Sequence, residues 1–439
     1  MQTIAPAAKA LPQLPANPAP GELVELHGAI YRIRDMSGFA FVILSTAREL
    51  VQTIFIPDQC GTPREAFAEG DQVIVQAEAR PEPRAKGGYD LVLRSVQRLS
   101  GPAALPELVI NKKELGLPLD TNLQYRSLCL RNHRERCIFR VQAGLAQGFA
   151  DFLYANGFTA IRTPKLVSAG AEGGSNIFAL DYFGRKAYLA QSPQLYKQAM
   201  VGVFERVYEI APVFRAEKHD TSRHLNEYTS VDFEMGFIDG FHDVMAMETA
   251  MLRHAMEHLM REYAPELNEL KAIVPDVGHI PALKFREAKE LLRDKLGRQV
   301  TDWQDFEPAE ETALCDYIRR ETGSDFVFVT HYPSSKRPFY AMDDSEDPGY
   351  TLSFDLLFRG LEVTTGGQRI HDYDAQVAKM RERGMDVDAF ESYLLIHKSG
   401  MPPHGGLGLG LERLTARLLG LDNVRRACLY PRDINRLEP

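Results

Sequence analysis

The sequence of 439 residues has few cysteines and no long apolar run. Its five cysteines are scattered and include no Cys-x-x-Cys pair, a usage that favours reduced, structural thiols in a cytoplasmic protein. No apolar stretch approaches the length of a transmembrane helix, and the first residues lack a signal-peptide pattern. We therefore expect no association with a membrane.

An excess of positive charge is also missing. The net charge of −9 argues against a protein that coats nucleic acid, although it leaves room for a local docking surface. A P-loop is missing too, because the glycine-rich segment Gly170–Asn176 lacks the GxxxxGK[ST] spacing. Its glycines could approach a ligand closely or form a mobile turn. The apolar content of 44% is that of a soluble globular protein, and the length predicts two or three domains.

The N-terminal part of the chain changes character twice. Residues 1–20 are rich in alanine and proline and predict a disordered tail. Residues 21–102 contain five short apolar runs separated by turn residues, a pattern that predicts a small OB-fold barrel. Phe39, Phe41 and Gln52 could stack on and read bases there, or could belong to the core or surface of the barrel. Residues 103–130 are predicted to form a linker.

Residues 131–439 predict a mixed α+β domain with an insertion at about 240–330. Helical spacing predicts a helix over 131–156, and an edge strand is expected over 158–167, where Pro164 interrupts the pattern. Residues 241–265 are strongly helical. Residues 266–330 indicate a less ordered stretch with one helix at about 308–321.

One hairpin organises this domain. Arg206–Phe214 and Glu227–Phe237 are expected to be strands, and the polar loop between them carries Arg215 and Arg223 near its two ends. Guanidinium groups bind phosphate oxygens in a bidentate way, so the loop suits a polyphosphate. A solvated hairpin with surface ion pairs is the alternative, and the segment alone favours it.

Three other groups of residues could contribute to a site. Gln194 and Lys197 share one face of a predicted helix and could recognise a carboxylate, or could form an exposed pair. Asp355 and Glu362 could hold Mg²⁺ around a nucleotide, or could be structural. Alternating glycines over 404–410 would let a strand pack against a ligand or a neighbouring backbone.

Taken in order, these segments resemble the class II aminoacyl-tRNA synthetases of subclass IIb, and among them the shorter, archaeal-like aspartyl-tRNA synthetases. GFTAIRTPKLV resembles motif 1, FRAEKHDTSRHLNEYTSVDFEM resembles motif 2, and GGLGLGLERL resembles motif 3. Three motifs in the correct order make the resemblance specific. It covers residue 21 to the C-terminus and implies an antiparallel sheet flanked by helices, with a homodimer formed through motif 1.

The resemblance also implies site residues. Catalytic roles fall to Arg215, His224 and Arg369. Aspartate would be bound by Glu172, Gln194, Lys197, Arg215, Tyr340, Thr365 and Arg369. ATP would be bound by Arg215, Ala216, Glu217, Arg223, His224, Leu225, Glu362, Gly410, Leu411, Glu412 and Arg413. Mg²⁺ would be held by Asp355, Glu362 and Thr365, the last replacing the serine of close relatives.

The choice of amino acid follows from QSPQLYK and GGQR, because Lys197 and Arg369 would face the side-chain carboxylate of aspartate and reject asparagine. An asparaginyl-tRNA synthetase is the weaker interpretation. An asparagine synthetase on the same fold would need no anticodon reader, and the intact set of motif residues argues against a silent paralogue.

The barrel would read the anticodon. Phe41 and Gln52 match the family's pair for the central U, although Ser45-Thr46 replace the usual Arg-Asp. His27 and Pro81 resemble residues of relaxed enzymes, whereas strict enzymes carry Trp and Lys. We therefore expect charging of both tRNA-Asp and tRNA-Asn, with the Asp-tRNA-Asn passing to an amidotransferase. A strictly discriminating enzyme is the alternative.

Overall fold

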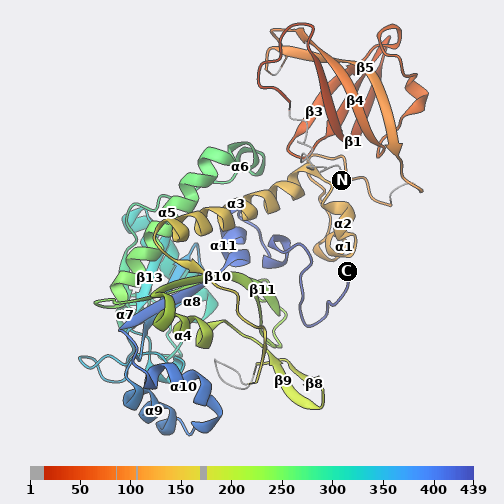
Figure 1. The fold of residues 1–439 in the computed structure, drawn as a ribbon. Coiled ribbons are helices and arrows are strands. Elements are labelled where there is room, and N and C mark those ends of the chain that lie inside the picture. Colours follow the sequence, from red (N-terminus) through yellow and green to blue (C-terminus); the bar gives the residue numbers. More distant parts are fainter. Residues whose placement is uncertain (1–13, 86, 105–106, 169–175) are drawn as a thin grey trace. The chain divides into compact units, whose positions relative to one another are not determined.

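The computed structural model describes residues 14–85, 87–104, 107–168 and 176–439 (Figure 1). The chain forms two compact units. The first contains the N-terminal part up to Pro118 together with Ser127–Arg136, and the second contains Leu119–Arg126 and Cys137–Pro439. No helix in these described ranges is both long and apolar enough to cross a membrane.

The first unit holds a closed five-stranded barrel with the strand order β1-β2-β3-β5-β4. Buried and partly exposed residues alternate along β2, as expected for a strand with one face in a core. The predicted OB-type barrel is thereby confirmed. Its strands are β1 (Leu23–Met36), β2 (Phe39–Ser45), β3 (Leu50–Phe55), β4 (Gln72–Pro81) and β5 (Tyr89–Ser100).

The second unit is built on an eight-stranded sheet with the order β12-β13-β14-β15-β16-β11-β10-β6. Its neighbours are antiparallel except at the two edges, where β12 pairs with β13 and β6 pairs with β10 in parallel. The predicted antiparallel sheet and the predicted hairpin are both present. The strands are β6 (Thr159–Ala160), β10 (Arg206–Phe214), β11 (Glu227–Gly236), β12 (Ala282–Lys284), β13 (Phe326–Thr330), β14 (Ser353–Phe358), β15 (Leu361–Arg369) and β16 (His404–Gly410).

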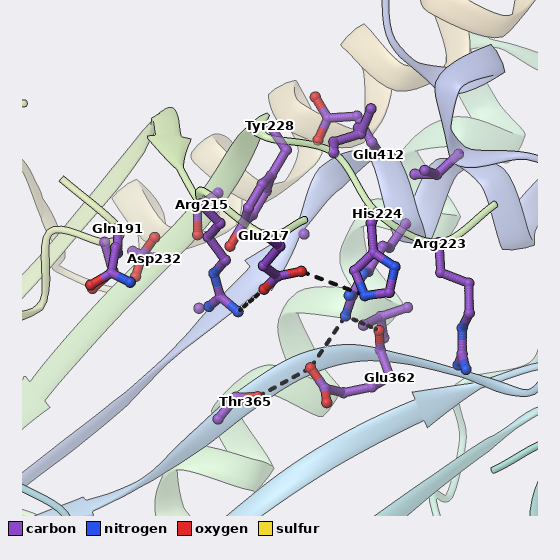
Figure 2. A pocket seen from close by; sticks show the side chains of 18 residues that line it. Gln191, Arg215, Glu217, Arg223, His224, Tyr228, Asp232, Glu362, Thr365 and Glu412 are labelled. Carbon is purple, nitrogen blue, oxygen red and sulfur yellow. Dashed lines mark hydrogen bonds and ion pairs between the residues drawn. The ribbon is translucent and has the colours of Figure 1, made fainter. Parts of the chain in front are cut away.

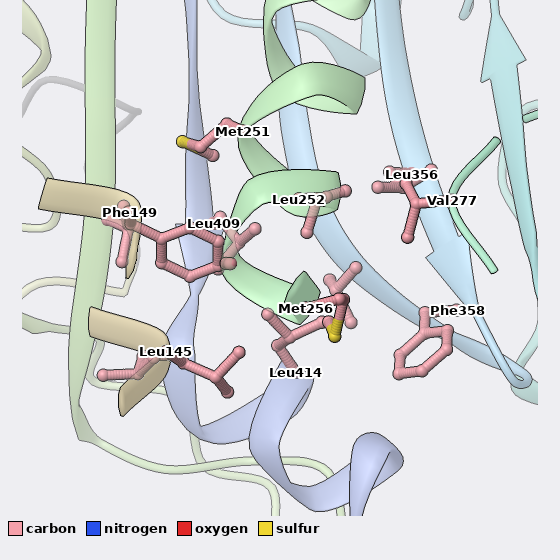
Figure 3. Packing of buried hydrophobic residues seen from close by; sticks show 14 of the residues in the cluster. Leu145, Phe149, Met251, Leu252, Met256, Val277, Leu356, Phe358, Leu409 and Leu414 are labelled. Carbon is pink, nitrogen blue, oxygen red and sulfur yellow. The ribbon is translucent and has the colours of Figure 1, made fainter. Parts of the chain in front are cut away.

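One face of this sheet is covered by α3 (His133–Ala155), α5 (Phe241–Glu262) and α11 (Leu411–Leu418). Figure 3 shows Phe149 of α3 beside Leu409 of β16, with Met251 of α5 and Leu414 of α11 near them and Phe358 of β14 on the opposite side of the same cluster. Side chains alternate between the two faces of a strand. The odd-numbered residues of β11 and β16 pack against these helices, so their even-numbered residues lie on the opposite face of the sheet.

The remaining elements surround the sheet. A separate three-stranded sheet has the order β7-β9-β8. These strands and the other helices are β7 (Leu166–Val167), β8 (Ala179–Tyr182), β9 (Arg185–Leu189), α1 (Leu119–Gln124), α2 (Arg126–Cys129), α4 (Gln194–Phe204), α6 (Ala264–Leu270), α7 (Phe285–Asp294), α8 (Pro308–Thr322), α9 (Tyr373–Glu382) and α10 (Glu391–Lys398).

Two expectations about local structure are wrong. The predicted strand over 158–167 is divided between two sheets, because β6 pairs with β10 whereas β7 pairs with β9. In the stretch 266–330, α8 confirms the helix expected at about 308–321, but the rest is more regular than expected: α7 and β13 share a hydrophobic core with α8, and β12 and β13 extend the main sheet. Pairing with distant strands supplies an order that local sequence pattern does not reveal.

Candidate active site

A cavity opens on the sheet face opposite α3, α5 and α11. Ser230 and Asp232 of β11 line it, while their neighbours Val231 and Phe233 pack in the core on the other face. The hairpin loop and the start of α11 complete the wall. The lining residues are Gln191, Ser192, Arg215, Glu217, Arg223, His224, Leu225, Tyr228, Ser230, Asp232, Glu362, Val363, Thr365, Gly408, Gly410, Glu412, Arg413 and Val424.

The alternating glycines of β16 make room on this face. A Cβ atom at Gly408 would lie 3.1 Å from Oδ1 of Asp232, and one at Gly406 would collide with the Glu234 carboxylate. Both carboxylates point at β16, so a side chain at either glycine position would fill the space that the carboxylates occupy. The glycines thus allow charged groups to lie directly on the sheet.

The outer part of the cavity is rich in arginine (Figure 2). Arg215 lies 3.8 Å from Glu217, and its guanidinium lies 5.8 Å from the centre of the Tyr228 ring. Arg413 donates to the backbone carbonyl of Glu362 at 3.1 Å and to its carboxylate at 3.3 Å. These guanidinium groups converge from separate elements, an arrangement that suits a ligand with several phosphates.

Arg223 and His224 extend this charged wall. Arg223 forms an ion pair with Glu311 of α8, where burial raises the pKa of Glu311 to about 7 despite the arginine. His224 contacts the Thr221 hydroxyl at 2.6 Å and the Glu217 carboxylate at 3.5 Å. Burial lowers the pKa of His224, and nearby cations add to this effect against the opposing Glu217. A histidine kept neutral here can exchange hydrogen bonds with a ligand.

A buried network of charges forms the inner end of the site. Lys197 of α4 lies 2.8 Å from Asp232 and 3.4 Å from Glu234, and Arg369 of β15 lies 2.9 Å from Glu234. Lys197 and Arg369 also donate to carbonyls of β16, at 2.7 Å and 2.9 Å. Burial alone would raise the pKa of Glu234, but Arg369 and Lys197 outweigh it and hold that pKa below its usual value. Two cations and two anions are therefore balanced beneath the cavity.

The comparison with known proteins fits this geometry. Residues 118–434 match the family model described as tRNA synthetases class II (D, K and N). The chain belongs to the class II tRNA synthetases. Named relatives span nearly its whole length: the Aspartate--tRNA(Asp/Asn) ligase of Thermus thermophilus is 47% identical over 95% of this chain and 97% of the relative, and that of Deinococcus radiodurans is 44% identical over 95% and 96%.

Solved structures agree on the fold of the synthetase. Asparaginyl-tRNA synthetase from Pyrococcus horikoshii, complexed with asparaginyl-adenylate, has a TM-score of 0.87 at 29% identity and covers 95% of this chain and 96% of its own. Aspartyl tRNA synthetase from Entamoeba histolytica has a TM-score of 0.84 at 28% identity, covering 97% and 91%. Because proteins with both names share this fold, the fold alone does not distinguish aspartate from asparagine.

Most residues expected in the synthetase's site lie together. Arg215, Glu217, Arg223, His224, Leu225, Glu362, Thr365, Gly410, Glu412 and Arg413 line the cavity. Lys197, Arg369 and Tyr340 are buried at its inner end, where the Arg369 guanidinium lies 5.3 Å from the Tyr340 ring. Gln194 is buried on α4, and its amide nitrogen has no hydrogen-bond partner among the described residues. Ala216 and Leu411 are not among the residues that line the cavity: Ala216 precedes Glu217, and Leu411 packs in the hydrophobic core. Glu172 lies outside the described residues.

Asp355, which lies opposite Thr365 in the pairing of β14 with β15, is an exception. It does not line the cavity, and its buried carboxylate pairs with Arg337 at 2.8 Å. Burial raises the pKa of Asp355 to about 6, with Glu362 adding to the rise and Arg337 opposing it. Within the described ranges, no group of three or more histidine, cysteine or acidic side chains is arranged to hold a metal ion.

Sequence reasoning missed several partners in the synthetase's site. Asp232 and Glu234 had no assigned role, although two carboxylates two residues apart in an apolar strand must share one face. Glu311 lies in the helix expected at about 308–321, but it had no assigned role. Gln191 and Val424 also line the cavity. Gln191 begins the QSPQLYK segment but had no assigned role, and nothing in its local sequence marks Val424.

His404 gives this network a pH dependence. Its Nδ1 donates to the Pro402 carbonyl at 2.9 Å, which leaves Nε2 to accept from Gln198 at 3.2 Å. Burial lowers the pKa of His404 to about 4, although Glu234 opposes the shift. Since the unfolded chain has the higher pKa, it binds more protons below about pH 6.5, and stability is lost as the pH falls from there towards 4.

We expect His404 to account for about 2 kcal/mol of the unfolding free energy lost between pH 7 and pH 5. Urea titrations of the protein and of His404→Asn at both values measure this contribution. The loss should be smaller by about that amount in the variant, since the other buried groups titrate in both proteins. An equal loss in the two proteins would show that His404 is not held neutral by the fold.

Proposed function

We propose that the synthetase ligates L-aspartate to tRNA with ATP as co-substrate, through an aspartyl-adenylate. The observation that carries the proposal is the pair of buried cations, Lys197 and Arg369, at the inner end of an arginine-rich cavity. It is supported by full-length relatives named Aspartate--tRNA(Asp/Asn) ligase, both more than 40% identical to this chain.

The two cations explain the preference for aspartate. Lys197 and Arg369 already share Asp232 and Glu234, so a third carboxylate from the substrate would make the same kind of charge-assisted hydrogen bond. The neutral amide of asparagine would compensate these charges less well. Gln194, whose buried amide nitrogen has no described partner, offers a further donor to the substrate. Tyr340 closes the pocket beside Arg369, and Glu172 is assigned to the α-ammonium group by resemblance alone.

The reaction needs positioning and charge stabilisation. The aspartate α-carboxylate attacks the α-phosphorus of ATP, the bond to the bridging oxygen breaks, and pyrophosphate leaves. Arg215 stabilises charge on the α-phosphate, Arg223 binds the leaving phosphates, and Arg413 stacks on adenine. The terminal 3′-hydroxyl of tRNA then attacks the carbonyl of the mixed anhydride and releases AMP. His224 lies where both substrates would meet.

Glu362 and Thr365 supply oxygen atoms suited to Mg²⁺. The Thr365 hydroxyl lies 3.4 Å from the Glu362 carboxylate, and both line the cavity. Mg²⁺ keeps several waters and binds phosphates, so one or two protein oxygens are enough, with Asp355 behind them on the next strand. Bound there, the ion would neutralise phosphate charge.

Motif 1 is proposed to form a homodimer. Its first strand, β6, is the outermost strand of the main sheet, and Leu166 of β7 is 49% exposed. An open sheet edge beside exposed apolar side chains is a surface that a second copy could cover. The five free cysteines fit a cytoplasmic location, where tRNA charging takes place.

The experiment that tests the choice of amino acid is ATP–pyrophosphate exchange with aspartate, with asparagine and with neither. We expect exchange with aspartate to exceed that with asparagine by about 10⁴-fold, the ratio typical of sites that bind a polar group of the substrate. Comparable exchange with asparagine would refute the proposal. Exchange with neither amino acid would show that the protein does not activate either of them.

The barrel is proposed to accept the anticodons of tRNA-Asp and tRNA-Asn. Its candidate residues lie on four strands: His27 on β1, Phe41 on β2, Gln52 on β3 and Pro81 at the end of β4. Phe41 packs edge-on against Phe39, and His27 lies 2.8 Å from Glu25. The product Asp-tRNA-Asn would be the substrate of an amidotransferase that converts the aspartyl group to asparaginyl.

Replacing His27 by Trp and Pro81 by Lys should restrict aspartylation to tRNA-Asp. We expect kcat/KM for tRNA-Asn to fall about tenfold or more while that for tRNA-Asp changes less than about threefold, because the new side chains oppose one anticodon only. Aspartylation of each purified tRNA by the double variant measures the ratio. If both tRNAs lose activity equally, these residues do not discriminate between anticodons.

A further inference from the structure

The C-terminal segment, residues 423–436, lies against the loop of motif 2, residues 217–226. The Val424 amide donates to the Ser222 carbonyl at 2.9 Å, and the Asn226 amide donates to the Arg432 carbonyl at 2.8 Å. Val424 itself lines the cavity. The C-terminal segment therefore contributes Val424 to the lining of the proposed ATP site, although it lies outside the three motifs.

One arginine joins the loop to both ends of this segment. Arg425 is buried, and its guanidinium pairs with Asp220 of the loop and with Asp433 at 2.6 Å. Asn435 donates to the other oxygen of Asp220 at 2.8 Å. The Asp220 side chain is about half exposed, so these two contacts are what hold it to the body of the domain.

Asp220 adjoins the residues proposed to bind ATP. The next residue, Thr221, contacts the His224 ring at 2.6 Å and accepts from the Arg223 amide at 3.2 Å. At the end of the loop, the Asn226 side chain donates to the Arg215 carbonyl at 2.7 Å. A shift at Asp220 would therefore pass directly to the side chains that face the phosphates.

Side chains from two helices hold the C-terminal segment in place by hydrogen bonds to its backbone. Arg126, which is almost fully buried, donates to the carbonyls of Cys428 at 2.6 Å and Leu429 at 2.9 Å. Gln142 of α3 donates to the Ala427 carbonyl at 2.7 Å. Because the segment is tied to two helices, it can serve as a fixed support for the loop, in addition to the ion pair between Arg223 and Glu311.

We propose that Arg425 is a positioning residue for ATP. Its ion pair with Asp220, called the latch below, holds the motif 2 loop against the C-terminal segment. The latch thereby positions Arg223 and His224 to contact the phosphates of ATP. This inference rests on the proposed function, since it assigns a role within the same ATP site. Misplacing binding groups by an ångström is enough to cost a large factor in activity, so the latch should act mainly on ATP.

The test compares Arg425→Ala and Asp220→Asn with the unmodified protein in aspartate-dependent pyrophosphate exchange. We expect each variant to raise the KM for ATP about tenfold or more, with the KM for aspartate changed less than about threefold. Arg425→Lys should recover part of the loss, because lysine keeps the charge but not the double contact. If Arg425→Ala does not fold, Asp220→Asn still removes the latch from the exposed side.

Arg426→Ala is the matched control. Arg426 is the next residue and pairs with Asp422 at 2.9 Å, away from the loop. An unchanged KM for ATP in Asp220→Asn, or equal rises in both KM values, would overturn the latch. Failure of the unmodified protein to exchange with aspartate would instead refute the proposed function, so the two failures are distinguishable.

Discussion

Arg215→Ala should reduce aspartate-dependent pyrophosphate exchange by about 10³-fold or more, as expected for loss of a group that stabilises transition-state charge. Arg215 follows β10 directly and lines the cavity beside Glu217, and it is the residue that we propose binds the α-phosphate. A neutral alanine would leave the α-phosphate without the guanidinium proposed to stabilise its charge. The loss should appear in kcat as well as in kcat/KM, because the interaction strengthens as charge develops.

Arg206→Ala controls for the loss of an arginine from the same strand. Arg206 begins β10, donates to the Asn156 carbonyl at 3.0 Å and does not line the cavity. Its variant should keep exchange within about threefold of the unmodified protein, as is usual for a change away from the reacting groups. Near-normal exchange by Arg215→Ala would remove this residue from the mechanism.

Lys197→Met should have a double effect. It leaves Asp232 buried without its ion-pair partner and Glu234 buried with Arg369, so we expect the free energy of unfolding to fall by about 3–5 kcal/mol. It should also raise the KM for aspartate by about 100-fold or more, because one of the two groups that face the substrate carboxylate is gone. Denaturant titration and exchange assays measure the two effects separately.

The double variant Lys197→Met/Asp232→Asn separates stability from binding. It restores the charge balance, since Arg369 and Glu234 remain paired at 2.9 Å. We expect most of the lost stability to return while activation of aspartate does not. Recovery of both properties would mean that Lys197 balances buried charge and takes no part in choosing the substrate.

Local pattern was sufficient for much of the fold. The five barrel strands follow from apolar runs broken by turn residues, and the hairpin of β10 and β11 follows from alternation around a polar loop. Residues 158–167 resisted prediction because their two halves pair with strands from different sheets. Residues 266–330 resisted it because β12 and β13 are ordered by each other and by β14, far along the chain.

The residues of the site also divide into those that the sequence predicted and those that it did not. Motifs 2 and 3 identified the residues of the outer cavity, since their spacing along the chain is itself diagnostic. The inner network was predicted only in part: the resemblance assigned Lys197 and Arg369 to one pocket, but Asp232 had no assigned role, because it meets them only through the order of strands in the sheet. The role of Arg425 likewise depends on where the C-terminal segment lies, which no motif specifies.

The most direct test of this account is aspartylation of purified tRNA-Asp and tRNA-Asn, side by side, with the unmodified protein and labelled aspartate. We predict that both tRNAs are charged and that labelled asparagine is transferred to neither. Charging of tRNA-Asp alone would contradict the dual specificity proposed for the barrel. Failure to charge either tRNA with aspartate would contradict the central assignment.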